Sequence, residues 1–143
     1  DVINGKGGND IICGNGGPDL IDGGSGADQL KGVDTSVVKG GSGNDWIIVS
    51  AGSTAYGGSG NDIIYATNGS IANGDSGRDS IFLDEGASGA NGGSGDDLIV
   101  NQGENQPAVN CGSGFDIYNT IGITSNQLID APSIKCERQN VPV

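Results

Sequence analysis

Aspartates recur along this chain at a nearly constant spacing, and each one closes a short glycine-rich segment. The spacings are 18, 17, 17, 17, 18 and 19 residues, for Asp10, Asp28, Asp45, Asp62, Asp79, Asp97 and Asp116. A carboxylate beside several backbone carbonyls is a donor set for a hard cation, because calcium takes about six to eight oxygen ligands. The pattern therefore predicts a repeated calcium site.

The six residues that end in each aspartate form one repeated turn, whose positions are numbered one to six below. The turns read GKGGND at 5–10, GGSGAD at 23–28, GGSGND at 40–45 and 57–62, GDSGRD at 74–79, GGSGDD at 92–97 and CGSGFD at 111–116. Glycine reaches positive φ, so such a backbone can bend tightly and aim its carbonyls at one point. Turn formation alone would not require aspartate at position six in all seven turns.

A period of 17 to 19 residues predicts a solenoid in which each coil stacks on its neighbours. We expect an all-β fold, a parallel β-roll or β-solenoid of about seven coils with one main calcium-binding edge. Two strands per coil should place two apolar ladders face to face in a thin core. One ladder is Ile12, Leu30, Ile47, Ile64, Ile81, Ile99 and Tyr118; the other is Ile21, Val38, Ala55, Ala72, Ala90 and Val109, with Val49, Ala66 and Leu83 extending the core.

These turns resemble the RTX family of secreted calcium-binding β-rolls, whose repeat is GGxGxDxUx, over nearly the whole chain. The resemblance implies that each calcium ion lies between two successive turns, so that seven turns enclose up to about six ions. It implies the seven aspartate carboxylates as ligands, together with backbone carbonyls from the first and third turn positions. Those carbonyls belong to Gly5, Gly7, Gly23, Ser25, Gly40, Ser42, Gly57, Ser59, Gly74, Ser76, Gly92, Ser94, Cys111 and Ser113.

The opposite edge of the roll departs from this pattern. One further turn, GNGGPD at 14–19, ends in Asp19, but the linking segments at 50–53, 67–70, 84–88 and 101–105 keep a glycine and lack the aspartate at that position. We therefore expect at most one extra, incomplete calcium site on this edge, at Asp19. Asp1 lies 18 residues before Asp19, so the chain begins inside a repeat whose other half is either upstream or supplied by a neighbouring copy.

The charge balance favours cations as partners. The 143 residues include 18 Asp and Glu against six Lys and Arg, a formal net charge of −12. This acidity argues against nucleic acid or an anionic membrane surface as a partner, since both need a basic patch. Six calcium ions would carry twelve positive charges, so we expect folding to be coupled to calcium binding. No apolar segment is long enough to span a membrane as a helix, and the predicted location is secreted, extracellular or cell-surface.

Three cysteines make one pair and one remainder. The closing segment is similar to the end of many bacterial and archaeal secreted calcium-binding repeat proteins, which implies a disulfide between Cys111 and Cys136. We therefore expect a β-roll over residues 1–119 and a capping segment over 120–143. Cys13 is left as either a buried thiol or an intermolecular link.

Strand alternation turns several apolar residues outward on one sheet: Trp46, Ile48, Ile63, Tyr65, Phe82, Leu98 and Val100. Apolar stripes of this kind mark interaction surfaces, and self-association is one interpretation. The other is that the C-terminal segment folds back over them. A head-to-tail filament with a calcium site shared across the joint is a separate hypothesis for the ends of the roll.

Three classes of function remain. The leading one is a non-enzymatic extracellular structural protein, such as a filament, surface or matrix component, because the sequence has no histidine, GxSxG or zinc motif. The second is the C-terminal repeat module of a secreted enzyme or adhesin. The third is an ice-binding solenoid, which the serines at position three, in place of threonines, disfavour.

Overall fold

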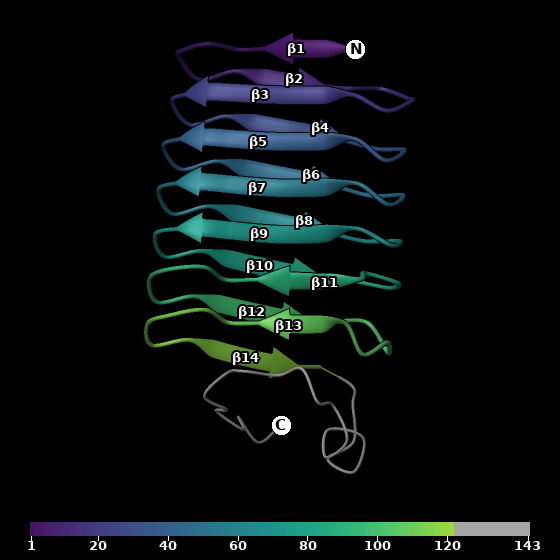
Figure 1. Cartoon of the computed structure of the whole chain (residues 1–143), viewed down its shortest axis with the longest axis vertical. Helices are drawn as coiled ribbons and strands as arrows, with labels where there is room; N and C mark the ends of the chain where they lie inside the picture. Colours follow the sequence, from purple (N-terminus) through teal and green to yellow (C-terminus); the bar gives the residue numbers. More distant parts are fainter. Residues whose placement is uncertain (122–143) are drawn as a thin grey trace.

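The computed structural model describes residues 1–121, and these form a stack of strands that alternate between two sheets (Figure 1). The first sheet contains β1 (Val2–Asn4), β3 (Leu20–Ser25), β5 (Val37–Ser42), β7 (Thr54–Ser59), β9 (Ile71–Ser76), β11 (Gly89–Asn91) and β13 (Ala108–Asn110). The second contains β2 (Ile11–Cys13), β4 (Gln29–Gly32), β6 (Trp46–Val49), β8 (Ile63–Ala66), β10 (Ser80–Leu83), β12 (Leu98–Asn101) and β14 (Ile117–Thr120).

Every strand pairs in parallel with the strand one coil away, so the chain winds as a single β-solenoid. The first sheet has the order β1-β3-β5-β7-β9-β11-β13, and the second has β14-β12-β10-β8-β6-β4-β2. The register keeps equivalent positions side by side, as where Ile47 pairs with Leu30 on one side and Ile64 on the other. The predicted all-β parallel roll of about seven coils is confirmed.

The two predicted ladders form the core between the sheets. All their members are buried, and so are Val49, Ala66 and Leu83. Isoleucine dominates the ladder on the second sheet, whereas alanines Ala55, Ala72 and Ala90 stand opposite on the first. Large side chains from one sheet facing small ones from the other fill a thin core at close packing.

The outward residues of the second sheet are exposed, as predicted, on β6 and β8, but they are less exposed than predicted on β10 and β12. Trp46, Ile48, Ile63 and Tyr65 are exposed, whereas Phe82 and Leu98 are half-buried. Val100 is only 7% exposed, so this outward position does not face solvent as alternation alone predicts. The C-terminal segment that was the alternative cover for this stripe lies outside the described residues.

The cysteines give a mixed result. Cys13 is a free, exposed cysteine, because the alternation of β2 buries Ile12 and turns Cys13 outward. The buried-thiol interpretation is therefore wrong. Cys111 is fully buried, but its predicted partner Cys136 and almost all of the predicted cap at 120–143 lie outside the described residues. Within residues 1–121 no helix is long and apolar enough to cross a membrane.

Candidate metal centre

The position-six aspartates stand in one row along an edge of the roll, joined by hydrogen bonds from coil to coil. The backbone N–H of Asp28 donates to Oδ1 of Asp45 at 2.8 Å, and Asp45 donates in the same way to Asp62. The remaining bonds run from Asp10 to Asp28, Asp62 to Asp79, Asp79 to Asp97 and Asp97 to Asp116, at 2.8 to 3.0 Å. One oxygen of each carboxylate from Asp28 onward is thereby fixed in position by the preceding coil.

The second oxygen of these carboxylates is buried without a hydrogen-bond partner. This holds for Oδ2 of Asp10, Asp28, Asp45, Asp62, Asp79 and Asp97. Leaving a charged group buried and unpaired is expensive, and native proteins pair such groups or use them to coordinate metals. A row of six such carboxylate oxygens therefore fits a row of cation sites.

Beside the first residue of each turn, the carboxylate oxygen Oδ2 of that turn lies close to a backbone carbonyl oxygen of the next turn. A methyl group built on Gly40 would overlap both Oδ2 of Asp45 and the backbone carbonyl oxygen of Gly57 in the next coil. Gly5, Gly23, Gly57, Gly74 and Gly92 repeat this arrangement. The glycine keeps a small space open between a carboxylate oxygen and a carbonyl oxygen of successive turns, and this donor chemistry suits calcium.

The third-position carbonyls, predicted as ligands, also serve as hydrogen-bond acceptors between coils. The carbonyl of Ser42 accepts the N–H of Gly26, and the carbonyl of Ser59 accepts that of Gly43, both at 2.8 Å. The carbonyls of Ser25, Ser76, Ser94 and Ser113 do the same. Each has a second lone pair, so a hydrogen bond does not prevent it from binding an ion.

The fourth position carries a constraint that the sequence prediction did not assign. Gly43 has φ of 125°, and a methyl group there would overlap the carbonyl oxygen of Gly26 in the preceding coil. Gly26, Gly60, Gly77, Gly95 and Gly114 have the same relationship to the coil before them. The recurrence of glycine at position four is the signal that could have revealed this close backbone contact.

Burial and mutual repulsion make the aspartate row hard to ionise without a cation. Burial raises the pKa of Asp79 to about 7, and the neighbouring charges of Asp62 and Asp97 add to this effect. Burial likewise raises the pKa of Asp62 to about 6, with a contribution from Asp45. The pKa values of Asp45 and Asp97 are also raised, chiefly by burial. A divalent cation would offset both costs.

The side chains alone do not make a metal cluster: within residues 1–121 there is no group of three or more His, Cys, Asp or Glu side chains that could hold an ion. Each turn instead offers one carboxylate and several backbone carbonyls. The family model of the RTX calcium-binding nonapeptide repeat, which is four copies long, matches residues 1–32, 34–53 and 39–70. The chain is an RTX-type repeat protein. No curated protein and no solved structure is significantly similar to it.

The RTX match places calcium-binding repeats over the first half of the chain, and the described coils beyond residue 70 keep the same register and aspartate row. The turns at Asp79, Asp97 and Asp116 make the same hydrogen bonds as those inside the matched region. Calcium is therefore the cation to which this chain's repeats correspond, and the residues present fit it.

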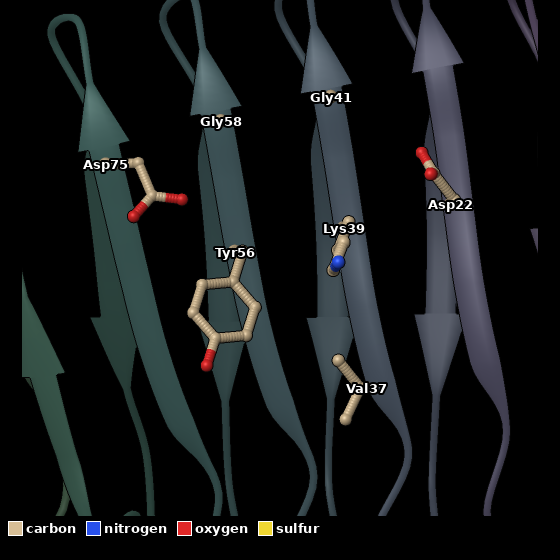
Figure 2. A pocket seen from close by; sticks show the side chains of 7 residues that line it. All are labelled: Asp22, Val37, Lys39, Gly41, Tyr56, Gly58 and Asp75. Carbon is tan, nitrogen blue, oxygen red and sulfur yellow. The ribbon is translucent and has the colours of Figure 1, made fainter.

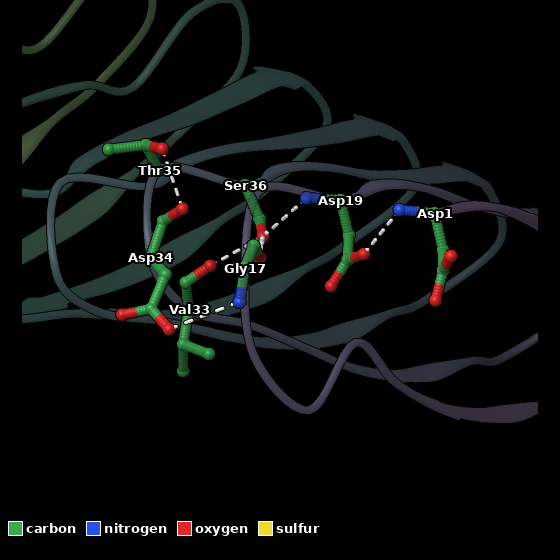
Figure 3. Close-up of polar contacts among 7 residues, drawn as sticks. All are labelled: Asp1, Gly17, Asp19, Val33, Asp34, Thr35 and Ser36. Carbon is green, nitrogen blue, oxygen red and sulfur yellow. Dashed lines mark hydrogen bonds and ion pairs between the residues drawn. The ribbon is translucent and has the colours of Figure 1, made fainter.

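The opposite edge replaces the RTX aspartate with serine (Figure 3). Asp19 starts this row, its N–H donating to Oγ of Ser36, and the N–H of Ser36 donates to Oγ of Ser53. Ser53 continues the row to Ser70. The hydroxyl of Ser53 also donates to the carbonyl of Ser50 in its own turn, at 2.7 Å. A serine hydroxyl therefore pairs with the N–H of the preceding coil and with a carbonyl of its own turn, and no cation is needed. The sequence prediction did not include this serine row.

Asp19 itself keeps one feature of a calcium turn. Its Oδ1 accepts a hydrogen bond from the amino group of Asp1 at 2.7 Å, while its Oδ2 is buried without a partner (Figure 3). However, the space beside Gly14 contains the side chain of Ile21 rather than a carbonyl of the next coil. This edge therefore offers fewer oxygen donors than an RTX turn on the other edge, in line with the predicted incomplete site.

A shallow depression of about 540 Å³ lies on the outer face of the first sheet and reaches the turns of the aspartate row at Gly41, Gly58 and Asp75 (Figure 2). Asp22, Lys39, Tyr56 and Asp75 surround it on four neighbouring strands, with Gly41 and Gly58 nearer the ends of two of these strands. It carries charges of both signs and is open to solvent. The sequence prediction did not single it out, because its residues recur once each rather than as a motif.

Proposed function

We propose that this chain is an extracellular calcium-binding structural protein whose β-roll folds on binding calcium and assembles into a filament, surface or matrix component. One observation carries the proposal: six carboxylate oxygens lie buried in a row with no hydrogen-bond partner. A structure of this kind is costly without cations and stable with them. The buried row also accounts for the regularly placed carboxylates without an enzymatic role.

The proposed ligands of each ion are the position-six carboxylates and backbone carbonyls of two successive turns. Seven turns leave six intervals, so up to about six ions would bind in the main row. The formal charge of −12 would then be balanced by twelve positive charges. Asp19 is proposed as one carboxylate of a weaker and incomplete site on the opposite edge.

Calcium supply sets where such a chain can fold. Extracellular modules bind calcium with dissociation constants of about 10⁻⁴ to 10⁻³ M, which match the calcium levels outside cells. At the much lower calcium concentration of a cytoplasm, the ionised row would oppose folding. We therefore place the folded protein outside the cell or on its surface.

The end of the roll supports assembly. β1 pairs with β3 along one edge, and its other edge has no partner among the described strands. Unpaired strand edges bind further strands, so another coil would extend the sheet. A preceding part of a longer chain or a second copy could supply that coil, and a second copy would also complete a calcium interval next to Asp10.

Electron microscopy and light scattering of the purified chain, in millimolar calcium and after chelation, test this proposal together with circular dichroism. We expect β-structure and elongated assemblies in calcium, and loss of both after chelation. A spectrum that chelation does not change would refute the calcium-coupled fold. Compact monomers in calcium would refute assembly and favour a repeat module of a larger secreted enzyme or adhesin.

A further inference from the structure

The outer face of the second sheet carries no charged side chain over four consecutive strands, β6, β8, β10 and β12. Its outward residues are Trp46, Ile48, Ile63, Tyr65, Ser80, Phe82, Leu98 and Val100. The chain as a whole has 24 charged residues among 143, so a face of this size without any is unusual for it. We call these eight residues the apolar face.

The aromatic side chains of the apolar face form a continuous row. Tyr65 stacks on Phe82 with ring centroids 4.8 Å apart and an interplanar angle of 14°. Trp46 lies on the other side of Tyr65, with centroids 6.5 Å apart and rings tilted by 52°. Trp46 is 48% exposed and Ile63 is 42% exposed, so this end of the row faces solvent. A flat, ordered and exposed aromatic surface is typical of interfaces.

The two sheets of the roll differ sharply in this respect. The outer face of the first sheet presents Asp22, Lys39 and Asp75 around its open depression (Figure 2). Two copies that met through the first sheet would bring the carboxylates of Asp22 and Asp75 close to like charges of the other copy. The apolar face is where two copies can meet without bringing charges of the same sign together.

We propose that the apolar face binds the same face of a second copy of this chain, so that two rolls pair side by side. This inference rests on the proposed function, because the face exists only in the folded roll. An anionic membrane surface is bound through clusters of Lys and Arg, and the apolar face carries none. A polysaccharide would require many hydrogen-bonding groups, and the side chains of the apolar face offer only the hydroxyl groups of Tyr65 and Ser80 and the indole N–H of Trp46. A second copy needs neither positive charge nor polar groups.

The size of the face sets the strength of the pairing. Four strands about 4.8 Å apart and four residues long, at about 3.3 Å per residue, cover a small area. By these spacings each copy contributes roughly 250 Å², so the contact lies well below specific interfaces, which bury about 1,200 Å² or more in total. Pairing of isolated rolls is therefore expected in the micromolar range or weaker, and it would strengthen where several rolls on one filament present the face together.

Sedimentation equilibrium in millimolar calcium and reducing agent, over a concentration series up to the millimolar range, tests this pairing. Ile63→Lys places a charge on the apolar face, between Trp46 and Ser80 of the neighbouring strands. Ile71→Lys is the matched control, because Ile71 is also 42% exposed and also begins a strand, but on the first sheet. We expect the wild type and Ile71→Lys to pair, and Ile63→Lys to bind its copies at least about tenfold more weakly.

Two further measurements keep the result unambiguous. Trp46 is the single tryptophan, so its fluorescence should shift to shorter wavelength as the protein concentration rises. Tyr65→Thr removes a ring from the face without adding charge, and it should weaken pairing as Ile63→Lys does. Equal pairing by Ile63→Lys and Ile71→Lys, or a wild type that sediments without any side-by-side association, would overturn the inference.

Failure of the proposed function would look different. A chain that gives no calcium-dependent circular dichroism has no folded face, and the proposed function itself then fails. A chain that folds on calcium but shows no concentration-dependent change in Trp46 fluorescence or mass retains the proposed function and loses only the pairing.

Discussion

The backbone N–H of Asp45 donates a hydrogen bond to Oδ1 of Asp62 in the next coil, at 2.8 Å. The same carboxylate buries its Oδ2 without a hydrogen-bond partner. Oδ1 therefore fixes the register between neighbouring coils, while Oδ2 remains free to bind a cation. An asparagine at this position could still accept the N–H of the preceding coil, but it could not supply the negatively charged oxygen for a cation.

Asp62→Asn separates these two roles. The amide oxygen can still accept the N–H of Asp45, but the negative charge beside the adjoining intervals is lost. We expect the calcium concentration needed for folding to rise roughly tenfold or more, because ligand charge tunes calcium affinity over several decades. A calcium titration followed by circular dichroism measures this midpoint.

Asp22→Asn is the control for Asp62→Asn, since it makes the same change of charge on the outer face of β3. It should leave the calcium midpoint nearly unchanged. Equal shifts in the two variants would mean that overall charge, rather than the aspartate row, governs folding.

Much of this fold could be predicted because the same residue types recur at the same positions of each repeat. Aspartate at position six and a large apolar residue two positions later, isoleucine in five of seven turns, repeat with nearly fixed spacing, which determines both the row and the core. The serine row at Ser36, Ser53 and Ser70 was missed because the prediction looked for carboxylates on that edge. A hydroxyl accepts the same N–H and satisfies a carbonyl as well.

The burial of Val100 shows a second limit. Cys13 and Val100 both occupy outward positions of the second sheet; Cys13 is exposed as alternation predicts, whereas Val100 is only 7% exposed. Alternation along a strand predicts which way a side chain points, but not what else lies over that face. Exposure at such positions depends on tertiary contacts that a local repeat does not encode.

The raised pKa values of the row predict competition between protons and calcium. The pKa values of Asp62 and Asp79 are about 6 and about 7, above the usual 3.8 of an unfolded aspartate. The metal-free roll therefore holds protons more tightly than the unfolded chain does. Its stability is greatest below about pH 4 and falls as the pH rises through 6 and 7.

Calcium that binds the folded, metal-free roll must displace those protons, so the affinity of this state for calcium should weaken as the pH falls below about 7. Isothermal titration calorimetry at pH 5.5 and pH 7.5, in buffers of different ionisation enthalpy, counts the protons released on binding. We expect more protons to be released per chain at pH 5.5, together with weaker binding. Identical affinity and no proton release at pH 5.5 would show that the row is already ionised without calcium.

Ser53→Ala tests the serine row on the edge without aspartates. Ser53 is 1% exposed; its Oγ accepts the N–H of Ser36 at 3.1 Å and donates to the carbonyl of Ser50. Removing the hydroxyl leaves buried backbone groups unpaired, which should cost about 1–3 kcal/mol of folding free energy. Thermal melting in saturating calcium measures the loss, and the number of bound ions should not change.

Ser59→Ala is the counterpart of Ser53→Ala on the calcium edge. Ser59 is exposed, and its proposed ligand is the backbone carbonyl rather than the hydroxyl. The variant should therefore melt and bind calcium like the wild type. A marked loss of calcium affinity in Ser59→Ala would show that the hydroxyl, not only the carbonyl, takes part in binding.

Gly43→Ala tests whether the close backbone approach at the fourth turn position is required. The added methyl group would overlap the carbonyl oxygen of Gly26, and the positive φ adds a further cost. Gly8→Ala occupies the same turn position with φ of 109°, but a methyl group there would meet no atom within 4 Å. In the unassembled roll, Gly8→Ala should therefore cost only the conformational penalty of about 1–2 kcal/mol.

Gly43→Ala should lose clearly more stability than Gly8→Ala and require more calcium to fold, because the clash forces adjacent turns apart where the ion would bind. Calcium titrations followed by circular dichroism compare the two variants directly. If both variants shift the calcium midpoint equally, the cost lies in the positive φ alone and the spacing between turns is not set by the glycine contact. A larger shift for Gly43→Ala would show that glycine at this position fixes the distance across which successive turns share calcium.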